Sequence, residues 1–379
     1  MIKILTIIGA RPQIIKAAAI SRAISKEFSG KIKEFIVHTG QHYDDNMSNV
    51  FFEELGIPKP SYNLNIGSGL HGEQTARMIE GIEELLLNEK PDYLLLYGDT
   101  NSTLSGAIAA SKLNIPIVHV EAGLRSYNRK MPEEINRIVC DHLSSLLFSP
   151  TKSGFQNLVN EGFNSANKAP FSPDNSGVFH CGDIMYDNSL HFVDLASKKS
   201  NILVESGLAT SKYVLATIHR DHNTDIPENL KSIFEALVTI SKQLKVVLPL
   251  HPRTEKMLHA TEHKKLLMKI NESKNLFLIP PVSFLDMIQL EKNSSLIITD
   301  SGGVQKESYF FNKPCIVLRP ETEWLEILET GKAKLVSADN KKILSAFDNL
   351  INMEQSEFPK IFGDGRAAEF ICETIIGNS

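Results

Sequence analysis

The chain has 379 residues, of which 42% are hydrophobic and 22% are charged, with a formal net charge of −5. A chain of this length exceeds one ordinary hydrophobic core, so we expect two domains. The acidic balance and a pI of about 6.2 argue against a nucleic-acid-binding protein, which usually carries a basic face. These numbers still allow a local basic pocket for a small anion.

The cysteines do not indicate disulfide bonds or a metal site, and the N-terminus does not indicate a signal peptide or a membrane span. The cysteines are Cys140, Cys181, Cys315 and Cys372, too far apart for a disulfide framework or a zinc site. The apolar N-terminus is interrupted by Arg11 and Lys16 and lacks a cleavage-site pattern, and no run reaches about 18 apolar residues. We therefore expect a soluble cytoplasmic protein that binds no membrane.

Short apolar runs alternate with amphipathic stretches along the whole chain. Each run is rich in aliphatic or β-branched residues, and most end at Gly, Asp, His or Pro, which predicts buried strands. The predicted strands are 2–9, 34–40, 92–99, 115–123, 146–151, 177–183, 213–219, 245–251, 275–281, 294–300, 313–319 and 333–338. Stretches with helical periodicity separate them, so the pattern predicts parallel sheets covered by helices on both faces.

A polar stretch at 164–176, rich in Ser, Asn and Pro, is typical of a surface linker. Similar numbers of strand–helix units precede and follow it. We therefore predict an α/β protein with two Rossmann-like, doubly wound domains, at 1–172 and 173–361, facing a central cleft. The residues alone leave open which domain the C-terminal helix at 362–379 joins.

The segment GARPQIIK follows the first predicted strand and opens a helix. It is not the GxGxxG motif, so its chemistry depends on Arg11 and Lys16. Cations beside a helix N-terminus suit a phosphate group. The alternative interpretation is a pair of solvated surface charges.

A second candidate for anion binding, TDSGGVQKES, follows the predicted strand at 294–300. Ser301, Gly302 and Gly303 stand where a helix begins, and free N–H groups there can hold a diphosphate. Glu307 lies one turn further on, where a carboxylate could accept from two vicinal ribose hydroxyls. The alternative is a Ser N-cap with a glycine turn. The segment lacks the lysine of a P-loop.

Acidic residues concentrate on three neighbouring predicted loops. Asp99 ends one strand and Glu121 ends the next, and Glu133 lies near Arg137 in the segment MPEEINR. Carboxylates held close together raise one another's pKa, which suits acid–base chemistry. Helix capping is the alternative for Asp99 and Glu133. It explains Glu121 less well, because Glu121 precedes Ala-Gly after an apolar strand.

Two histidine motifs end neighbouring strands in the second half of the chain. ATIHRDHN contains His219 and Arg220, and LHPR contains His251 and Arg253. A buried histidine that only satisfies a carbonyl is the alternative for His219. The repetition of the motif favours an anionic ligand.

The segments GARPQIIK, TGQH, YGDTNSTL, HVEAGLRS, MPEEINR, FSPT, HR, TDSGGVQKE and KPCIVLR together resemble the non-hydrolysing UDP-N-acetylglucosamine 2-epimerase family, in order and across nearly the whole chain. The resemblance implies a glycosyltransferase-B-like fold, a homodimer, and a helix at 362–379 that joins the first domain. It implies catalytic roles for Asp99, Glu121, Glu133 and His219. The positions that match contacts to the diphosphate, sugar or ribose are Arg11, Lys16, Arg137, Ser301, Gly302, Gly303 and Glu307.

Three segments depart from the family pattern. HRDHN has His222 where Glu is usual, so that ligand contact is not predicted. YDDNM at 43–47 replaces a stretch that contributes to an allosteric UDP-sugar site, so activation by substrate is not predicted either. RPETEWLE at 319–326 replaces TTERPE. With RSYNRKMPEE, it is closer to the branch that acts on UDP-2,3-diacetamido-2,3-dideoxyglucuronate.

The chemistry of the sugar narrows the mechanism. C2 of an N-acetylhexosamine is not beside a carbonyl, so direct removal of its proton is implausible, and the chain has no dinucleotide fingerprint for oxidation by NAD. We predict that UDP leaves C1 while a base removes the C2 proton, and that UDP then adds back, with no cofactor or metal. The alternatives are the same reaction on the diacetamido uronate, a glycosyltransferase, a hydrolysing relative and a non-enzymatic sensor of nucleotide sugars.

Overall fold

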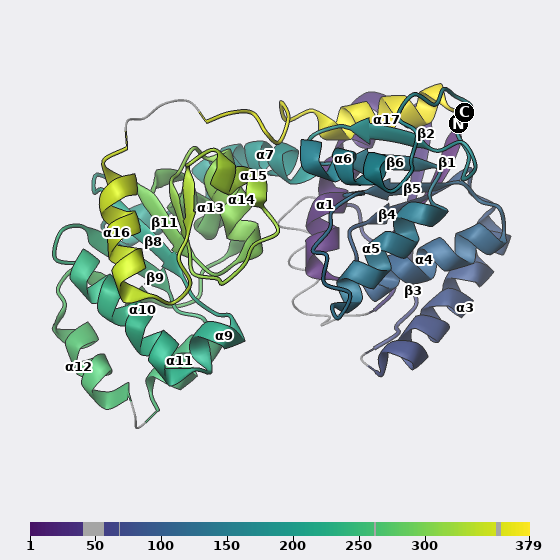
Figure 1. Cartoon of the computed structure of the whole chain (residues 1–379). Helices are drawn as coiled ribbons and strands as arrows, with labels where there is room; N and C mark the ends of the chain where they lie inside the picture. Colours follow the sequence, from purple (N-terminus) through teal and green to yellow (C-terminus); the bar gives the residue numbers. More distant parts are fainter. Residues whose placement is uncertain (41–56, 68, 261–262, 354–357) are drawn as a thin grey trace. The chain divides into compact units, whose positions relative to one another are not determined.

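The computed structural model describes residues 1–40, 57–67, 69–260, 263–353 and 358–379. It divides into two compact units (Figure 1). Unit 1 comprises Met1–Asn188 and Lys360–Ser379, and unit 2 comprises Ser189–Pro359. Within the described ranges, no helix is long and apolar enough to cross a membrane.

Unit 1 is built on a parallel sheet of seven strands in the order β3-β2-β1-β4-β5-β6-β7. The strands are β1 (Ile2–Ile8), β2 (Ile32–His38), β3 (Tyr62–Asn63), β4 (Tyr93–Tyr97), β5 (Ile117–Val120), β6 (Leu146–Ser149) and β7 (Gly177–His180). All residues of β4 and β5 are buried, because helices cover both faces of the sheet. The strand order reverses between β1 and β4, so the carboxyl ends of these strands form the switch point where ligands of such sheets bind.

The helices of unit 1 pack through buried faces with helical spacing. They are α1 (Arg11–Ala23) with the π-helical turn η1 (Ile24–Phe28), α3 (His71–Glu89), α4 (Asn101–Lys112), α5 (Pro132–Leu143), α6 (Lys152–Asn160), the start of α7 (Ile184–Lys199) and α17 (Ala367–Gly377). In α3 the buried residues Gln74, Met78, Ile82 and Leu86 recur every four positions, which places them on one face. Helix α17, yellow in Figure 1, packs against α1 although the whole of unit 2 separates them in sequence.

The strand β7 follows the polar stretch at 164–176 and pairs with β6, with Gly177 opposite Leu146. It therefore completes the sheet of unit 1, and the division between the units falls inside α7 rather than in the polar stretch. That stretch is a loop between α6 and β7, held by its own side chains. Asn167 donates to the carbonyl of Ser176 at 3.0 Å, and Asn175 donates within the loop as well. Composition alone does not distinguish such a loop from a linker.

Unit 2 has a parallel sheet of six strands in the order β10-β9-β8-β11-β12-β13. The strands are β8 (Tyr213–Thr217), β9 (Lys245–Pro249), β10 (Leu276–Ile279), β11 (Leu296–Thr299), β12 (Cys315–Val317) and β13 (Ala333–Leu335). The helices are α8 (Ile202–Glu205), α9 (Asp221–Thr224), α10 (Pro227–Ile240), α11 (Pro252–Leu258), α12 (Lys264–Glu272), α13 (Phe284–Asn293), α14 (Gly302–Phe310), α15 (Leu325–Glu329) and α16 (Asn340–Ile351). Here the strand order reverses between β8 and β11, which makes their carboxyl ends the second switch point.

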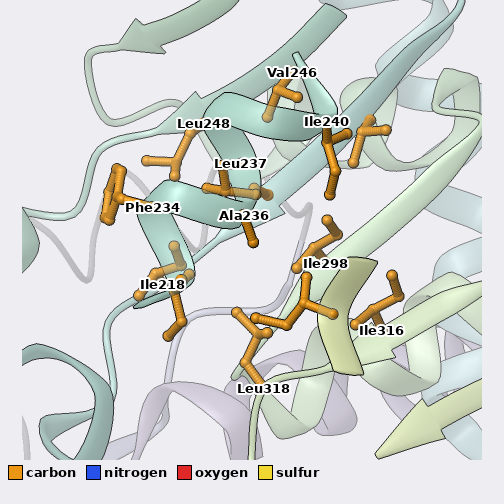
Figure 2. Packing of buried hydrophobic residues seen from close by; sticks show 14 of the residues in the cluster. Ile218, Phe234, Ala236, Leu237, Ile240, Val246, Leu248, Ile298, Ile316 and Leu318 are labelled. Atoms are coloured by element: carbon orange, nitrogen blue, oxygen red, sulfur yellow. The ribbon is translucent and has the colours of Figure 1, made fainter. Parts of the chain in front are cut away.

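The core of unit 2 forms where α10 meets its sheet (Figure 2). Phe234, Leu237 and Ile240 of α10 are completely buried and pack with Val246 and Ile298 of the strands. Burial of each such side chain contributes about 1.5–3 kcal/mol. This packing fixes the sheet whose strand ends carry the polar residues described next.

Candidate active site

Gln13 ties the two strands of the first switch point together. Its Oε1 accepts from the backbone N–H groups of Gly9 at 2.8 Å and Ala10 at 3.1 Å, and its Nε2 donates to the carbonyl of Tyr97 at 2.9 Å. A Cβ on Gly9 would lie 2.0 Å from Oγ of Ser102, so only glycine allows this close approach. The start of α1 is thereby fixed beside the end of β4.

Lys16, in the second turn of α1, forms an ion pair with Glu121, which directly follows β5. The side chains are 14% and 8% exposed, so water screens their attraction only weakly. Gly98 follows β4 with a φ of +63°, and a Cβ there would lie 3.3 Å from both charged groups. The glycine therefore leaves room for the ion pair at the strand ends.

The backbone of Glu121 adopts a left-handed conformation, with a φ of 72°. For a residue with a Cβ this costs about 1–2 kcal/mol, and such strain concentrates at functional sites. The surrounding contacts must hold the conformation in place. Gly123, two residues later, donates its N–H to Asp141 at 3.1 Å.

A buried network centred on Asp141 supports the two loops that follow β4 and β5. His119 Nδ1 lies 2.7 Å from one oxygen of Asp141, and its Nε2 lies 2.8 Å from the carbonyl oxygen of Gly98. Arg125 lies 2.7 Å from the other oxygen of Asp141. Burial acts to raise the pKa of Asp141, but the hydrogen bond from His119 and the charge of Arg125 outweigh it and lower that pKa. The network thus fixes the backbone at Gly98, directly before Asp99, and on both sides of Glu121 at His119 and Gly123.

Asp99, after β4, forms an ion pair with Arg137 of α5. The side chain of Arg137 is 13% exposed and that of Asp99 is 32% exposed. Burial acts to lower the pKa of Arg137, but the nearby carboxylate of Asp99 outweighs it and raises that pKa. Unit 1 therefore presents two carboxylates, each beside its own cation, after neighbouring strands.

The two glutamates at the start of α5 have different environments. Glu133 is exposed, whereas Glu134 is 1% exposed and lies 2.7 Å from Arg137. Glu134 also accepts from the backbone N–H groups of Ser126 at 2.9 Å and Tyr127 at 2.8 Å. Burial raises its pKa, but these hydrogen bonds give a net lowering. Glu134 therefore anchors the preceding loop and Arg137, while Glu133 stays accessible. The predicted phosphate ligand Arg11 is likewise exposed, as the first residue of α1.

In unit 2, Asp300 orients His219 at the ends of β8 and β11. The completely buried carboxylate of Asp300 accepts from the backbone N–H groups of His219 and Arg220 and from the amide of Asn223, each at 3.0 Å. Nδ1 of His219 lies 3.3 Å from the same carboxylate. Burial lowers the pKa of His219 and Asp300 opposes this effect, with a net lowering. The ring of His251 lies 5.5 Å from that of His219.

Ser301 is the N-cap of α14, and its Oγ accepts from the N–H of Val304 at 3.4 Å. Gly302 and Gly303 form the first turn of the helix, whose remaining N–H groups give the end a partial positive charge. A Cβ on Gly302 would lie 2.6 Å from the carboxylate of Glu323, which is paired with Arg319 at 2.8 Å. The segment RPETEWLE, which departs from the family pattern, thus lies against the glycine turn.

Glu307 lies on the next turn of α14 and is half-buried, and burial raises its pKa. His222, in place of the usual Glu, is exposed on α9. The YDDNM segment at 43–47 lies outside the described residues. The predicted site residues thus form one group in unit 1 and another in unit 2, each at the switch point of its own sheet.

Comparison with known proteins identifies relatives along nearly the whole chain. Residues 25–376 match the model of a family described as UDP-N-acetylglucosamine 2-epimerase. A UDP-N-acetylglucosamine 2-epimerase homolog of Methanococcus maripaludis is 50% identical over 374 residues, which cover 98% of this chain and 99% of the relative. The UDP-2,3-diacetamido-2,3-dideoxy-D-glucuronate 2-epimerase of Pseudomonas aeruginosa is 47% identical over 372 residues and covers 98% of both chains.

A solved structure shows the same likeness. The UDP-GlcNAc 2-epimerase of Methanocaldococcus jannaschii, solved in complex with UDP-GlcNAc and UDP, is 42% identical with a TM-score of 0.81 and covers 99% of both chains. The predicted fold class, with two doubly wound α/β sheets of the glycosyltransferase-B-like kind, is confirmed. The chain belongs to the UDP-N-acetylglucosamine 2-epimerase family of isomerases.

Proposed function

We propose that the protein converts UDP-N-acetylglucosamine to UDP-N-acetylmannosamine by eliminating UDP and adding it back through a 2-acetamidoglucal. The supporting observation is the pair of carboxylates, Asp99 and Glu121, that follow neighbouring strands and are each paired with a cation. The left-handed backbone of Glu121 adds to it, because the fold maintains a strained residue at this position.

The proposed reaction breaks two bonds of the sugar. The bond between C1 and the diphosphate oxygen breaks, and its electron pair leaves on UDP. A carboxylate takes the C2 proton, and the electrons of that bond form the double bond between C1 and C2. Return of a proton to the opposite face of C2 and of UDP to C1 gives the epimer.

The acid–base roles fall to carboxylates on both sides of C2. We assign them to Asp99, Glu121 and Glu133, of which Glu133 is exposed at the start of α5. The residues assigned to the departing diphosphate are Arg11, Lys16, Arg137, His219 and the turn at Ser301, Gly302 and Gly303. Cations and helix N–H groups stabilise the charge that develops on the leaving group. Glu307 is assigned to the ribose hydroxyls.

Proton NMR of the protein with UDP-N-acetylglucosamine in D₂O tests the proposal. We expect a new anomeric signal from UDP-N-acetylmannosamine, with deuterium at C2 of the product. An epimer without deuterium would contradict the elimination mechanism. Release of free UDP with N-acetylmannosamine would indicate a hydrolysing enzyme instead.

A second substrate is supported by a specific observation. The segment RPETEWLE, which differs from the usual family pattern, contacts the glycine turn of α14 through Glu323. The relative from Pseudomonas aeruginosa carries the name of a UDP-2,3-diacetamido-2,3-dideoxy-D-glucuronate 2-epimerase. The same NMR assay with both nucleotide sugars gives the ratio of kcat/KM values, and a ratio above one for the uronate would identify it as the preferred substrate.

The homodimer implied by the family resemblance stays a prediction. Size-exclusion chromatography with light scattering measures the mass in solution. A mass of twice 42.2 kDa would support the dimer, and a mass of 42.2 kDa would contradict it.

A further inference from the structure

Both ring nitrogens of His119, in β5, lie within hydrogen-bond distance of an oxygen atom. Nε2 lies 2.8 Å from the carbonyl oxygen of Gly98, and Nδ1 lies 2.7 Å from a carboxylate oxygen of Asp141. The side chains of His119 and Asp141 are completely buried, so bulk solvent does not compete for these contacts. The two oxygen atoms therefore decide which protons the ring carries.

The contacts of these oxygen atoms indicate a proton on each ring nitrogen. The carbonyl oxygen of Gly98 can only accept, so Nε2 must donate. The other oxygen of Asp141 accepts from the N–H of Gly123 at 3.1 Å and lies 2.7 Å from Arg125, which stabilises the ionised carboxylate. Burial acts to raise the pKa of Asp141, but its contacts with His119 and Arg125 lower that pKa overall. The proton between Nδ1 and Asp141 therefore belongs to His119, and the ring is an imidazolium.

The charges of the network lead to the same conclusion. A buried charge is costly unless an opposite charge compensates it. Arg125 lies between two carboxylates, because its guanidinium is 2.7 Å from Glu161 as well as 2.7 Å from Asp141. With a charged His119, the network contains two cations and two anions. With a neutral His119, it would hold one uncompensated negative charge.

The position of His119 connects this charge to the candidate active site. Gly98 directly precedes Asp99, and His119 stands two residues before Glu121. Through Asp141, the ring is also connected to the N–H of the second residue after Glu121. Hydrogen bonds that involve an ionised group are roughly twice as strong as neutral ones. The charged ring therefore holds the backbone at both carboxylates more firmly than a neutral ring would.

We propose that His119 is a positioning residue, an imidazolium at neutral pH that holds the carboxylates of Asp99 and Glu121 in their reactive positions. This inference rests on the proposed acid–base roles of these two carboxylates. His119 itself is completely buried, so it neither contacts the nucleotide sugar nor exchanges a proton with it. In this it differs from His219, whose side chain is 36% exposed and is assigned to the diphosphate.

Nitrogen-15 NMR of the full chain with labelled histidine tests the charge without any turnover. In an imidazolium both nitrogens carry a proton and have similar chemical shifts, whereas in a neutral ring one nitrogen lacks a proton and the shifts lie far apart. The signals of His119 are those that are missing from His119→Gln. We expect the imidazolium pattern in the wild type at neutral pH. A neutral pattern would overturn the inference.

Asp141→Asn changes the partner of the ring and leaves His119 in place. We expect the ring to show the neutral pattern in this variant, because the amide of Asn can donate to an unprotonated Nδ1. An imidazolium in this variant would show that Asp141 does not hold the proton on the ring. If His119→Gln does not fold, the signals that change in Asp141→Asn identify His119.

Turnover of His119→Gln tests the positioning role, because Gln can still donate to Gly98 but carries no charge. We expect kcat for the nucleotide sugar that the wild type epimerises to fall about 100-fold, since small displacements of reacting groups have effects of this size. The dissociation constant of UDP, measured by calorimetry, should stay within about threefold of the wild type. The matched control is His142→Gln, at a histidine of α5 that is 52% exposed and lies 3.8 Å from Glu161, and it should retain both wild-type values.

The possible outcomes separate this inference from the proposals on which it rests. A kcat of His119→Gln within about threefold of the wild type would overturn the positioning role, even for a charged ring. A loss of UDP affinity equal to the loss of kcat would indicate a general structural role and would overturn it as well. A wild type that epimerises no nucleotide sugar would overturn the proposed function and the positioning role, while the NMR spectra would still decide the charge. If His119→Gln does not fold, Asp141→Asn should show the same fall in kcat with UDP affinity retained.

Discussion

The ammonium group of Lys16 and the carboxylate of Glu121 form an ion pair that joins α1 to the end of β5. Lys16→Met removes this ammonium group, so the largely buried carboxylate of Glu121 loses its ion pair with Lys16. We expect initial rates of epimer formation to fall by at least about 100-fold, because both the position of Glu121 and the charge facing the diphosphate change. Lys26→Met, on an exposed site of η1, is the control. Equal rates in the two variants would contradict the role of Lys16.

Glu121→Gln tests the carboxylate itself. The amide has nearly the same shape but is a poor base, so we expect no measurable turnover above the limit of the NMR assay. UDP binding should stay close to that of the wild type, since Glu121 is not assigned to the nucleotide. The checks are turnover by NMR and UDP affinity by calorimetry. Near-normal turnover would exclude Glu121 as an acid–base group.

The left-handed backbone of Glu121 makes a separate prediction about stability. Both Glu121→Gly and Glu121→Ala lose the ion pair with Lys16, but only glycine adopts a φ of 72° without strain. We expect the Gly variant to exceed the Ala variant by about 1 kcal/mol in the free energy of unfolding, the reverse of their order in a regular helix or strand. Urea titration measures the difference. A more stable Ala variant would show that the backbone is not held in this conformation.

Asp300 is predicted to set the titration of His219. Asp300→Asn removes the negative charge that opposes the effect of burial, so the pKa of His219 should fall further below its ordinary value. Turnover should fall by at least about tenfold, because the imidazole also loses its fixed orientation. NMR titration of the histidine ring protons follows the pKa directly. An unchanged or raised titration point would contradict this electrostatic role of Asp300.

Asp187 of α7 is predicted to make the stability of unit 1 depend on pH. It accepts from the N–H of Ala368 at 2.8 Å, and burial is the main cause that raises its pKa from 3.8 to about 6. Because folding favours the neutral form, this contribution to stability is complete below pH 3.8 and is lost as the pH rises through 6.

As the pH rises from about 4 to 7, the free energy of unfolding of the wild type should therefore fall by up to about 3 kcal/mol because of Asp187. Asp187→Asn should abolish this fall. Urea titrations at several pH values provide the measurement. Asp194→Asn, on an exposed site of the same helix, is the control and should keep the wild-type dependence. Parallel pH profiles for wild type and Asp187→Asn would contradict the prediction.

The strands were predictable because parallel sheets bury both faces and leave continuous apolar runs. Each predicted strand coincides with an observed one. Among the described strands, the one that the sequence analysis did not predict is β3, Tyr62–Asn63, which is too short to carry a period. The polar stretch at 164–176 was misleading as a domain boundary, because the pairing of β7 with β6 is a long-range contact that composition does not encode.

The candidate site residues could be predicted where they directly follow a strand. Their contacts with residues from other strands and helices could not be predicted. Asp99, Glu121 and His219 stand out at strand ends. Asp300, however, reaches His219 from the end of another strand, and Asp141 of α5 reaches His119, which lies two residues before Glu121. The sequence also did not determine the residue at which α5 begins, and therefore which of its glutamates is buried. A helix that begins at Pro132 buries Glu134 and exposes Glu133, and a start shifted by one residue would change that assignment.

The membership of α17 in unit 1 has a consequence for the order of events during synthesis. The ribosome completes every residue of unit 2 before it makes α17, whose buried side chains Ile371, Cys372 and Ile375 belong to unit 1. Unit 2 can therefore fold on the nascent chain while unit 1, although begun first, still exposes the surface that α17 covers. A premature stop after residue 359 would damage the earlier-made unit and leave the later-made one intact.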